Sequence, residues 1–284
     1  MKILTACVGF TLCLFLTISS GMAQPALKFC AYPSKSPKFI AVTYGPLVKY
    51  LSEQIGIPIK LVTAPDRETF QIRALNEEYD LALPCTACYF ELLDKTGYYA
   101  IARGEPSFTG GVFVKKDSSI TRPEQLLQGK RIAAVKQYSY AGFLFWYEYL
   151  IDKDLLNQFT SSSVFLENQD SIAYAILNSK VDAGVIRTDA LKTYKLTALK
   201  DQFRIILESR EIPHFPFVAS AKLDKDLVQK IRASLTSLSI DTPEGKKLFQ
   251  AMGVKRIAAV SDADYDAFRQ SYHKAFQAWK ENNK

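Results

Sequence analysis

Residues 131–135 read RIAAV, residues 136–142 read KQYSYAG, and residues 143–151 read FLFWYEYLI. The first run has the pattern of a short strand, the second holds a serine, a glycine and two tyrosines, and the third is long enough to begin a helix. A helix that starts after such a loop has free backbone N–H groups and a partial positive charge at its first turn. The stretch therefore predicts a place for a small anion, and an ordinary strand–helix turn that binds only water is the alternative.

Strand and helix patterns alternate on both sides of this stretch, and Asp66 and Asp170 stand where they can cap helices. The strand patterns lie at residues 27–32, 58–63, 79–83, 110–114, 163–166, 181–187 and 217–220. The helix patterns lie at residues 39–55, 66–76, 143–151, 170–178, 189–196, 224–239, 242–252 and 262–280. Two further helices are expected to begin at residue 89 and at a capping box over residues 121–124. This alternation predicts an α/β fold with two lobes, each with a mainly parallel sheet flanked by helices.

Ligands of such sheets bind beyond the carboxyl ends of the strands, so the loops found there are expected to converge on a cleft between the lobes. These loops are residues 33–37, 84–88, 136–142, 168–170 and 187–188.

The N-terminus has the pattern of an export signal. Lys2 is followed by an almost wholly apolar run over residues 3–18, and Gly21 and Ala23 are small residues at the positions that a signal peptidase reads. We therefore expect residues 1–23 to be a signal peptide and the rest to be periplasmic, with an uncleaved anchor as the alternative. The net charge of +7 comes from scattered basic residues, which argues against binding of nucleic acid.

Three cysteines, Cys30, Cys85 and Cys88, remain after the expected cleavage. Cys85 and Cys88 have the spacing of a thiol redox motif, but an oxidising compartment favours a structural disulfide that joins Cys30 to one of the two. His214 and His273 do not have zinc-ligand spacing to the cysteines, so no metal and no cofactor are expected. No nucleophile elbow is present, and a thiol redox enzyme that uses Cys85 and Cys88 is kept only as an alternative to a binding protein.

The chain resembles the periplasmic solute-binding proteins of phosphate, phosphite and phosphonate ABC transporters. The resemblance rests on short motifs in a fixed order: Tyr44–Leu47, Asp80–Ala82, Asp117–Ile120, Leu126–Arg131, Ser139 with Gly142, Val181–Val185, Ile212–Pro213 and Asp264–Asp266. It implies a type II periplasmic-binding-protein fold that closes on a small ligand, and a monomer. Lobe 1 would comprise residues 24–111 and 208–284 and lobe 2 residues 112–207, with a two-strand hinge near residues 108–112 and 207–212.

The chain departs from the family pattern at the expected site. Where the family usually has Ser-Thr/Ser-Ser-Gly, this chain has Ser139-Tyr140-Ala141-Gly142, so two hydroxyl groups are lost. Gln169 stands where the family usually has a histidine, and Cys85-Thr86 replaces a Gly-Pro, whereas Tyr89 matches a family tyrosine. The resemblance therefore implies a small anionic solute, either a phosphonate-like or phosphite-like oxyanion or a related polar compound.

We expect Ser139 to offer its hydroxyl and amide to the solute, and Arg187 to offer a cation at a strand end. The candidate ligand-binding residues are Ser139, Tyr140, Tyr138, Ala141, Gly142, Arg187, Gln169, Tyr89, Thr86, Tyr32 and Ser36. The expected function is capture of the solute and its delivery to an ABC-transporter membrane permease. The alternative is a sensor of the same fold that signals to a membrane receptor or kinase.

Overall fold

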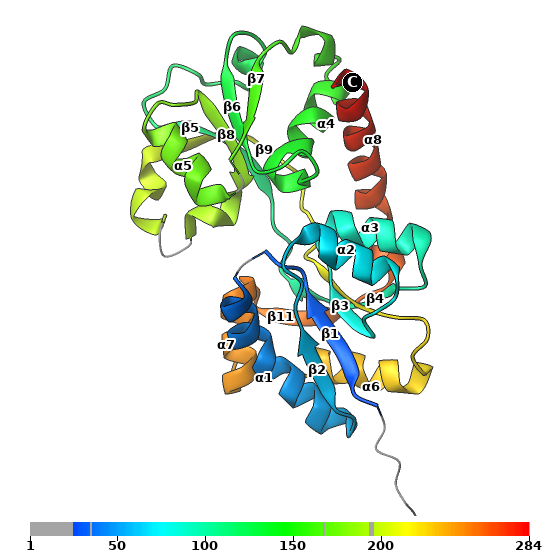
Figure 1. Cartoon of the computed structure of the whole chain (residues 1–284). Helices are drawn as coiled ribbons and strands as arrows, with labels where there is room; N and C mark the ends of the chain where they lie inside the picture. The colour runs from blue at the N-terminus through cyan, green and yellow to red at the C-terminus, as the bar shows by residue number, and fades with distance from the viewer. Residues whose placement is uncertain (1–24, 35, 167, 193–195, 284) are drawn as a thin grey trace, which may run out of the picture.

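The computed structural model describes residues 25–34, 36–166, 168–192 and 196–283. The expected signal peptide, residues 1–23, lies outside this part of the chain. Within these ranges no helix combines the length and the apolar character that a membrane crossing requires. Two β-sheets, each with its own helices, lie one above the other in Figure 1 and form the two lobes of the molecule.

Lobe 1 is built on a six-stranded sheet in the order β11-β4-β10-β3-β1-β2. The strands are β1 (Leu27–Ala31), β2 (Ile59–Val62), β3 (Leu81–Leu83), β4 (Tyr99–Glu105), β10 (Pro216–Ala219) and β11 (Arg256–Ala259). β1 pairs in parallel with β2 and β3, whereas β10 is antiparallel to β3 and β4, and β11 is antiparallel to β4. Four strands thus run in one direction, and β10 and β11 run in the other.

The two faces of this sheet have separate apolar cores, because alternate side chains of a strand point to opposite faces. Phe29 packs with the helices of one face, and its neighbour Cys30 packs with those of the other. The first face is covered by α1 (Pro37–Ile55), α6 (Lys225–Thr236) and α7 (Pro243–Met252), and the second by α2 (Arg67–Leu75) and α3 (Thr86–Lys95). The starts of α2 and α3 therefore lie on the same side of the sheet (Figure 1).

Lobe 2 is built on a five-stranded sheet in the order β7-β6-β8-β5-β9. The strands are β5 (Gly110–Lys115), β6 (Arg131–Ala134), β7 (Ser162–Phe165), β8 (Ala183–Arg187) and β9 (Phe203–Glu208), and the helices are α4 (Phe145–Asp152) and α5 (Gln169–Leu177). β6, β7 and β8 are parallel, and β5 is antiparallel to β8 and β9. A π-helical turn, Tyr140–Leu144, leads into α4.

Two chain segments cross side by side between the lobes, one from β4 to β5 and one from β9 to β10. They are joined by Phe108 and Ile212, whose backbones exchange hydrogen bonds of 3.0 and 2.7 Å. This pair lies where the resemblance places the hinge. The expected lobe boundaries at residues 111 and 207 fall inside β5 and β9, so the exact division of the chain stays a prediction.

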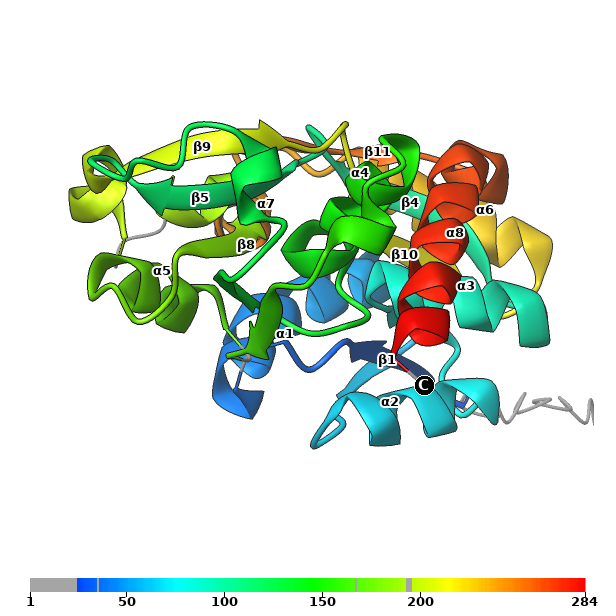
Figure 2. The ribbon, with the colours of Figure 1, turned by 90° about the horizontal axis from the view of Figure 1, so that it is seen from above.

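The last helix, α8 (Asp266–Asn282), contacts both lobes. It runs alongside α4 of lobe 2, and its first turns lie close to α3 of lobe 1 (Figures 1 and 2). Phe268 illustrates both contacts, because its ring centroid lies 4.7 Å from that of Tyr140 and 5.6 Å from that of Phe90. The C-terminal segment thus connects the lobes in addition to the two hinge segments.

The structure corrects several of the expected elements. β4, β9 and β11 have no counterpart among the expected strands. The apolar run of β4 does not alternate and is followed by Arg103 and Gly104, and β11 has only four residues. The capping box at 121–124 starts only a 3-10 turn, Pro123–Leu126, and Gly129 follows it in the left-handed region with φ +64°. Likewise, the helix expected at 189–196 is described only as a 3-10 turn, Thr188–Lys192, and residues 193–195 lie outside the described part.

Two helix starts also differ from the expectation. α3 begins at Thr86 rather than Tyr89, because the sulfur of Cys85 accepts the backbone N–H of Cys88 and caps the helix, so residues 86–88 are helical and not a loop. α5 is capped by Asn168, whose side chain accepts the N–H of Ser171 at 2.8 Å, and the expected cap Asp170 lies within its first turn. The expected cap Asp66 is confirmed, with 2.7 Å to the N–H of Thr69.

Candidate functional site

Side chains from both lobes meet around the guanidinium group of Arg67. Arg67 is the first residue of α2, Tyr32 follows β1, and Cys85 caps α3, so all three come from lobe 1. Tyr138, in the loop between β6 and the π turn of lobe 2, has its ring centroid 4.3 Å from the guanidinium carbon of Arg67 and interacts with the hydroxyl of Tyr32. We call Tyr32, Arg67, Cys85, Cys88 and Tyr138 the Arg67 cluster.

The charge of Arg67 is only partly balanced. Its Nε atom is buried without a hydrogen-bond partner, and among the residues that the structure describes no carboxylate forms an ion pair with it. Burial opposes its charged form, but the thiols of Cys88 and Cys85 and the nearby tyrosine hydroxyls outweigh burial and raise the pKa of Arg67 above its usual value. A fixed guanidinium with unused donor capacity is well suited to a planar or tetrahedral oxyanion.

The helix start of lobe 2 directly follows Tyr138 in the chain, because Ser139 is the next residue. The hydroxyl of Ser139 accepts the backbone N–H of Gly142 at 3.2 Å, so Ser139 is the N-cap of the π turn. The first N–H groups of a helical segment have no acceptor within that segment, which leaves those of Tyr140 and Ala141 directed at its start. Gly142 has no room for a side chain, since an added Cβ would lie 2.7 Å from a methyl carbon of Val135.

The side chain of Tyr140 is turned away from this helix start and into the protein. It is buried, its hydroxyl hydrogen-bonds to Glu148, and Arg210 approaches the same oxygen at 3.4 Å. Burial, with the contribution of Glu148, raises its pKa above the usual value. The Tyr140 hydroxyl therefore stabilises the contact between α4 and the segment after β9, and the backbone N–H is what this residue offers at the helix start.

A second interlobe cluster lies at the hinge. The guanidinium of Arg187 is held by the carboxylate of Asp189, with 2.8 and 2.5 Å between their atoms, and stacks 3.6 Å from the ring centroid of Phe108. Gln169 accepts the backbone N–H of Arg187 at 2.9 Å. Burial and then the charge of Arg187 lower the pKa of His214 to about 3, so this imidazole stays neutral. Arg187 is thus already paired with a carboxylate, unlike Arg67.

The remaining candidates lie on lobe 1 and have structural partners. Tyr89 is fully buried and donates its hydroxyl to Asp262 at 2.5 Å. Thr86 is buried in the first turn of α3, one residue after Cys85. Ser36 is exposed and caps α1 by accepting the N–H of Phe39 at 3.3 Å. The structure therefore brings Tyr32 and Tyr138 together beside Arg67, with Ser139 next in the chain, whereas Tyr89 and Ser36 have hydrogen-bond partners of their own.

All three cysteines of the described part are free, so the expected Cys30 disulfide is wrong. Cys30 is fully buried in the core under β1, where its thiol contacts the carbonyl oxygen of Ala31 at 3.7 Å and burial raises its pKa to about 11. Cys85 and Cys88 instead interact with each other at the start of α3. Within the described ranges no group of three metal-ligating side chains is found.

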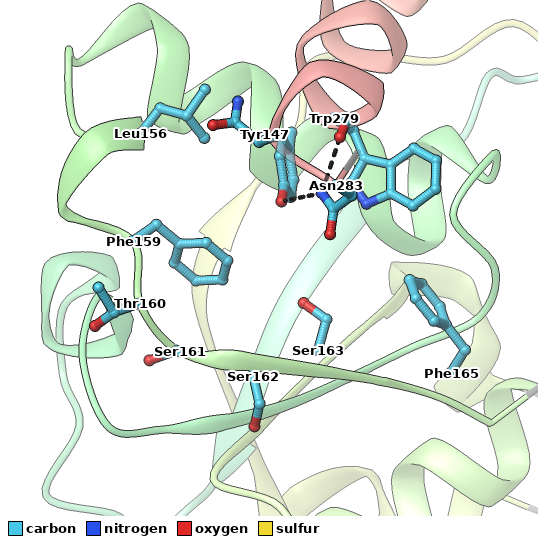
Figure 3. Close-up of a pocket in the computed structure, with 11 residues that line it drawn as sticks. Tyr147, Leu156, Phe159, Thr160, Ser161, Ser162, Ser163, Phe165, Trp279 and Asn283 are labelled. Carbon is cyan, nitrogen blue, oxygen red and sulfur yellow. Dashed lines mark hydrogen bonds between the residues drawn. The ribbon is translucent and has the colours of Figure 1, made fainter.

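A pocket of about 350 Å³ lies elsewhere in lobe 2, between α4, β7 and the end of α8 (Figure 3). Aromatic side chains, among them Tyr147 and Trp279, form part of its wall, and a run of hydroxyl residues, 160–163, forms another part. None of the expected ligand-binding residues lines it, and its lining residues are uncharged. It therefore offers no cation to pair with an oxyanion.

Arg67 is the site residue that sequence reasoning missed. The loop after the second strand, residues 63–66, ends at the same carboxyl edge as the loops that were considered. The signal that could have found it is a cation immediately after the helix cap Asp66 at that edge. Its contact with Tyr138, which lies 71 positions later, is not visible in the sequence.

Two α/β lobes, a hinge of two paired segments and a cluster shared by both lobes define a two-lobed solute-binding protein. The family model for the periplasmic substrate-binding protein of phosphonate ABC transporters matches residues 29–265. The chain belongs to this family, which consists of transport-associated binding proteins rather than enzymes.

Solved structures agree with this fold. A binding protein component of an ABC phosphonate transporter from Pseudomonas aeruginosa is 21% identical, with 89% of this chain and 87% of that chain covered and a TM-score of 0.70. PhnD1 from Prochlorococcus marinus in complex with methylphosphonate is 16% identical, with 88% and 97% covered and a TM-score of 0.74. A Xanthomonas citri protein bound to ATP is 17% identical, with 90% and 98% covered and a TM-score of 0.73. At these identities the likeness shows the fold.

Proposed function

We propose that this protein captures a small phosphonate-type oxyanion between its lobes in the periplasm and delivers it to the membrane permease of an ABC transporter. The observation that carries the proposal is the guanidinium of Arg67, whose Nε has no hydrogen-bond partner and which lies on the ring of Tyr138, the residue before the helix cap Ser139. Family membership and the methylphosphonate bound to PhnD1 support the class of ligand. In this proposal residues 1–23 are removed as a signal peptide, and the mature protein acts as a monomer.

The proposed division of labour follows from the contacts. Arg67 supplies the positive charge from lobe 1, and Ser139 with the N–H groups of Tyr140 and Ala141 supplies neutral donors from lobe 2. Tyr32 and Tyr138 surround the anion and limit the size of its organic substituent. Because the backbone supplies N–H groups whatever the side chain, the Ser139–Gly142 loop keeps its amide donors although two hydroxyl groups of the usual family pattern are absent.

The test uses mature protein that has been unfolded, freed of bound solute by dialysis and refolded. Calorimetric titration with methylphosphonate measures the affinity of the wild type and of Arg67→Met. A hydrogen bond to a charged group contributes about 1.5–3 kcal/mol, so we expect the variant to bind roughly 10–100-fold more weakly. Arg256→Met is the control, because Arg256 is an exposed arginine of β11 that pairs with Glu105.

The same titration with phosphate, phosphite, sulfate and a short carboxylate tests the ligand class. We expect a phosphorus oxyanion to bind more tightly than the carboxylate, because a tetrahedral anion accepts from both the guanidinium and the helix start. An absence of binding by every phosphorus compound, or equal affinities for the wild type and Arg67→Met, would overturn the proposal.

A further inference from the structure

The pocket between α4, β7 and the end of α8 is separate from the Arg67 cluster. It has a volume of about 350 Å³ and shares no lining residue with that cluster. Most of its lining residues carry a hydroxyl or an amide group, and the others are apolar. A cavity of this size holds a small molecule when polar groups converge on it, so the chemistry of its walls defines the ligand.

Two polar side chains in this pocket have unused hydrogen-bonding capacity. The hydroxyl of Ser163, on β7, has no hydrogen-bond partner among the residues that the structure describes. Asn283 donates its side-chain amide to the carbonyl oxygen of Trp279 at 2.8 Å and to the hydroxyl of Tyr147 at 3.4 Å, which leaves its carboxamide oxygen as an acceptor. Figure 3 shows this oxygen and the Ser163 hydroxyl pointing toward one another across the pocket. A ligand with hydroxyl groups satisfies both, because a hydroxyl donates and accepts.

The aromatic part of the wall is a corner and not a slot. The rings of Tyr147 and Phe159 lie 6.1 Å apart with 76° between their planes. Trp279, which also lines the pocket, has its ring stacked on that of Phe276, with 6.0 Å between centroids and 7° between planes. Rings at such an angle do not clamp a flat heterocycle between parallel faces. They fit a thicker ring whose C–H groups lie against aromatic faces.

The absence of charge from the lining narrows the ligand further. An ion would lose its hydration here without a charged partner. A wholly apolar ligand would cover the Ser163 hydroxyl and the Asn283 oxygen and leave both unpaired. The ligand that matches the walls is therefore neutral, carries hydroxyl groups around its rim and has C–H groups on its faces.

We propose that this pocket is a second ligand site, which binds a neutral monosaccharide in its pyranose form. The C–H groups of the sugar ring lie against Tyr147, Phe159 and Trp279, and its hydroxyl groups bond to Ser163 and Asn283. The sugar bridges β7 to the last turns of α8, two elements that lie more than a hundred positions apart in the chain.

The test follows tryptophan fluorescence while the mature protein is titrated with D-glucose, D-galactose and D-mannose. The chain has two tryptophans, of which Trp279 lines the pocket and Trp146 is fully buried outside it. We expect a saturable change with at least one of these sugars and a Kd of about 1 mM, from the binding energy per non-hydrogen atom that small ligands reach. The change should persist in Trp146→Phe, because Trp279 is the reporter.

Two variants of Ser163 locate the site. Ser163→Ala removes one neutral hydrogen bond, so we expect binding about 2–10-fold weaker. Ser163→Phe fills the pocket and should abolish the fluorescence change. Ser119→Phe is the matched control, because Ser119 is an exposed serine after β5 that does not line the pocket, and it should bind the sugar as the wild type does.

Each outcome decides the proposal. No saturable change with any of the three sugars, equal affinities of the wild type and both Ser163 variants, or tighter binding of adenosine than of every sugar would overturn it. Displacement of the sugar by methylphosphonate would also overturn it, because the two sites share no residue. If no phosphorus oxyanion binds but the sugar signal follows the Ser163 variants as expected, the proposed function fails and the sugar site stands.

Discussion

Replacing Tyr89 with phenylalanine separates a structural role of this tyrosine from a role in ligand binding. The hydroxyl donates to a carboxylate oxygen of Asp262 at 2.5 Å, and the same oxygen accepts the backbone N–H of Ala100 at 2.7 Å. The ring packs against Tyr265 with 5.1 Å between centroids, and this packing is kept by phenylalanine. The variant therefore removes one hydrogen bond to a charged group and little else.

The expected magnitude follows from this geometry. A hydrogen bond to a charged group contributes about 1.5–3 kcal/mol, and Asp262 keeps one of its donors, so we expect a loss of about 2 kcal/mol in the free energy of unfolding. For a chain of this size that corresponds to a fall in Tm of about 4–8 °C. Urea unfolding followed by circular dichroism, with thermal melts in parallel, measures both quantities.

The control is Tyr50→Phe, which removes a partly buried hydroxyl that bonds to the neutral carbonyl oxygen of Ser234 at 3.1 Å. We expect that variant to lose about 1 kcal/mol or less. Methylphosphonate affinity should be unchanged by Tyr89→Phe, because this hydroxyl lies outside the Arg67 cluster. A Tyr89→Phe protein that is as stable as the wild type but binds methylphosphonate more weakly would refute the reasoning.

Three further predictions concern stability. Gly142→Ala places a methyl group 2.7 Å from a valine methyl carbon and should lower the free energy of unfolding by about 1–3 kcal/mol. At Gly45 an added Cβ would have no neighbour within 4 Å, so Gly45→Ala should raise the free energy of unfolding by about 0.5–1 kcal/mol. Thermal melts measure both changes. Burial and a neighbouring arginine lower the pKa of His214 from 6.5 to about 3. Between pH 6.5 and about pH 3 the imidazole of His214 is therefore protonated in the unfolded chain and neutral in the folded protein. Stability should therefore fall as the pH drops below 6.5, and His214→Gln should flatten that fall in urea titrations; an unchanged pH profile would contradict the assignment. Asn168→Ala should cost about 1 kcal/mol by removing the cap of α5, and Asn168→Asp should restore most of it, so equal stability of Asn168→Ala and the wild type would show that the cap is dispensable.

Local patterns in the sequence were sufficient for the fold class. The alternation of strand and helix patterns is set by which faces of each element are apolar, and this is a property of neighbouring residues. Asp66 was recognised as a helix cap because capping depends on residues three positions apart. β4 escaped prediction because its strand character depends on pairing with β10 and β11, which lie more than a hundred positions later.

The candidate site could be predicted only in part. Tyr32, Tyr138 and Ser139 follow from the rule that loops at the carboxyl edge carry ligands, and the structure brings Tyr32 and Tyr138 close to each other. The same rule selected Arg187, but it gave no information on Asp189, which holds that guanidinium in the folded protein. Side-chain partners decide which cation is available, and partners are assigned by tertiary packing.

The sequence by itself determined the alternation of elements, the loop at Ser139 and the pair Cys85 and Cys88, because each of these is a matter of residue types at short spacing. Only the tertiary structure decided that the guanidinium of Arg67 lies on the ring of Tyr138 with its Nε unpartnered, that the hydroxyl of Tyr140 points into the protein, and that the cysteine pair lies close to Arg67. The physical reason is that burial and charge pairing depend on distances between segments far apart in the chain, and those distances are fixed only when the two lobes pack against each other.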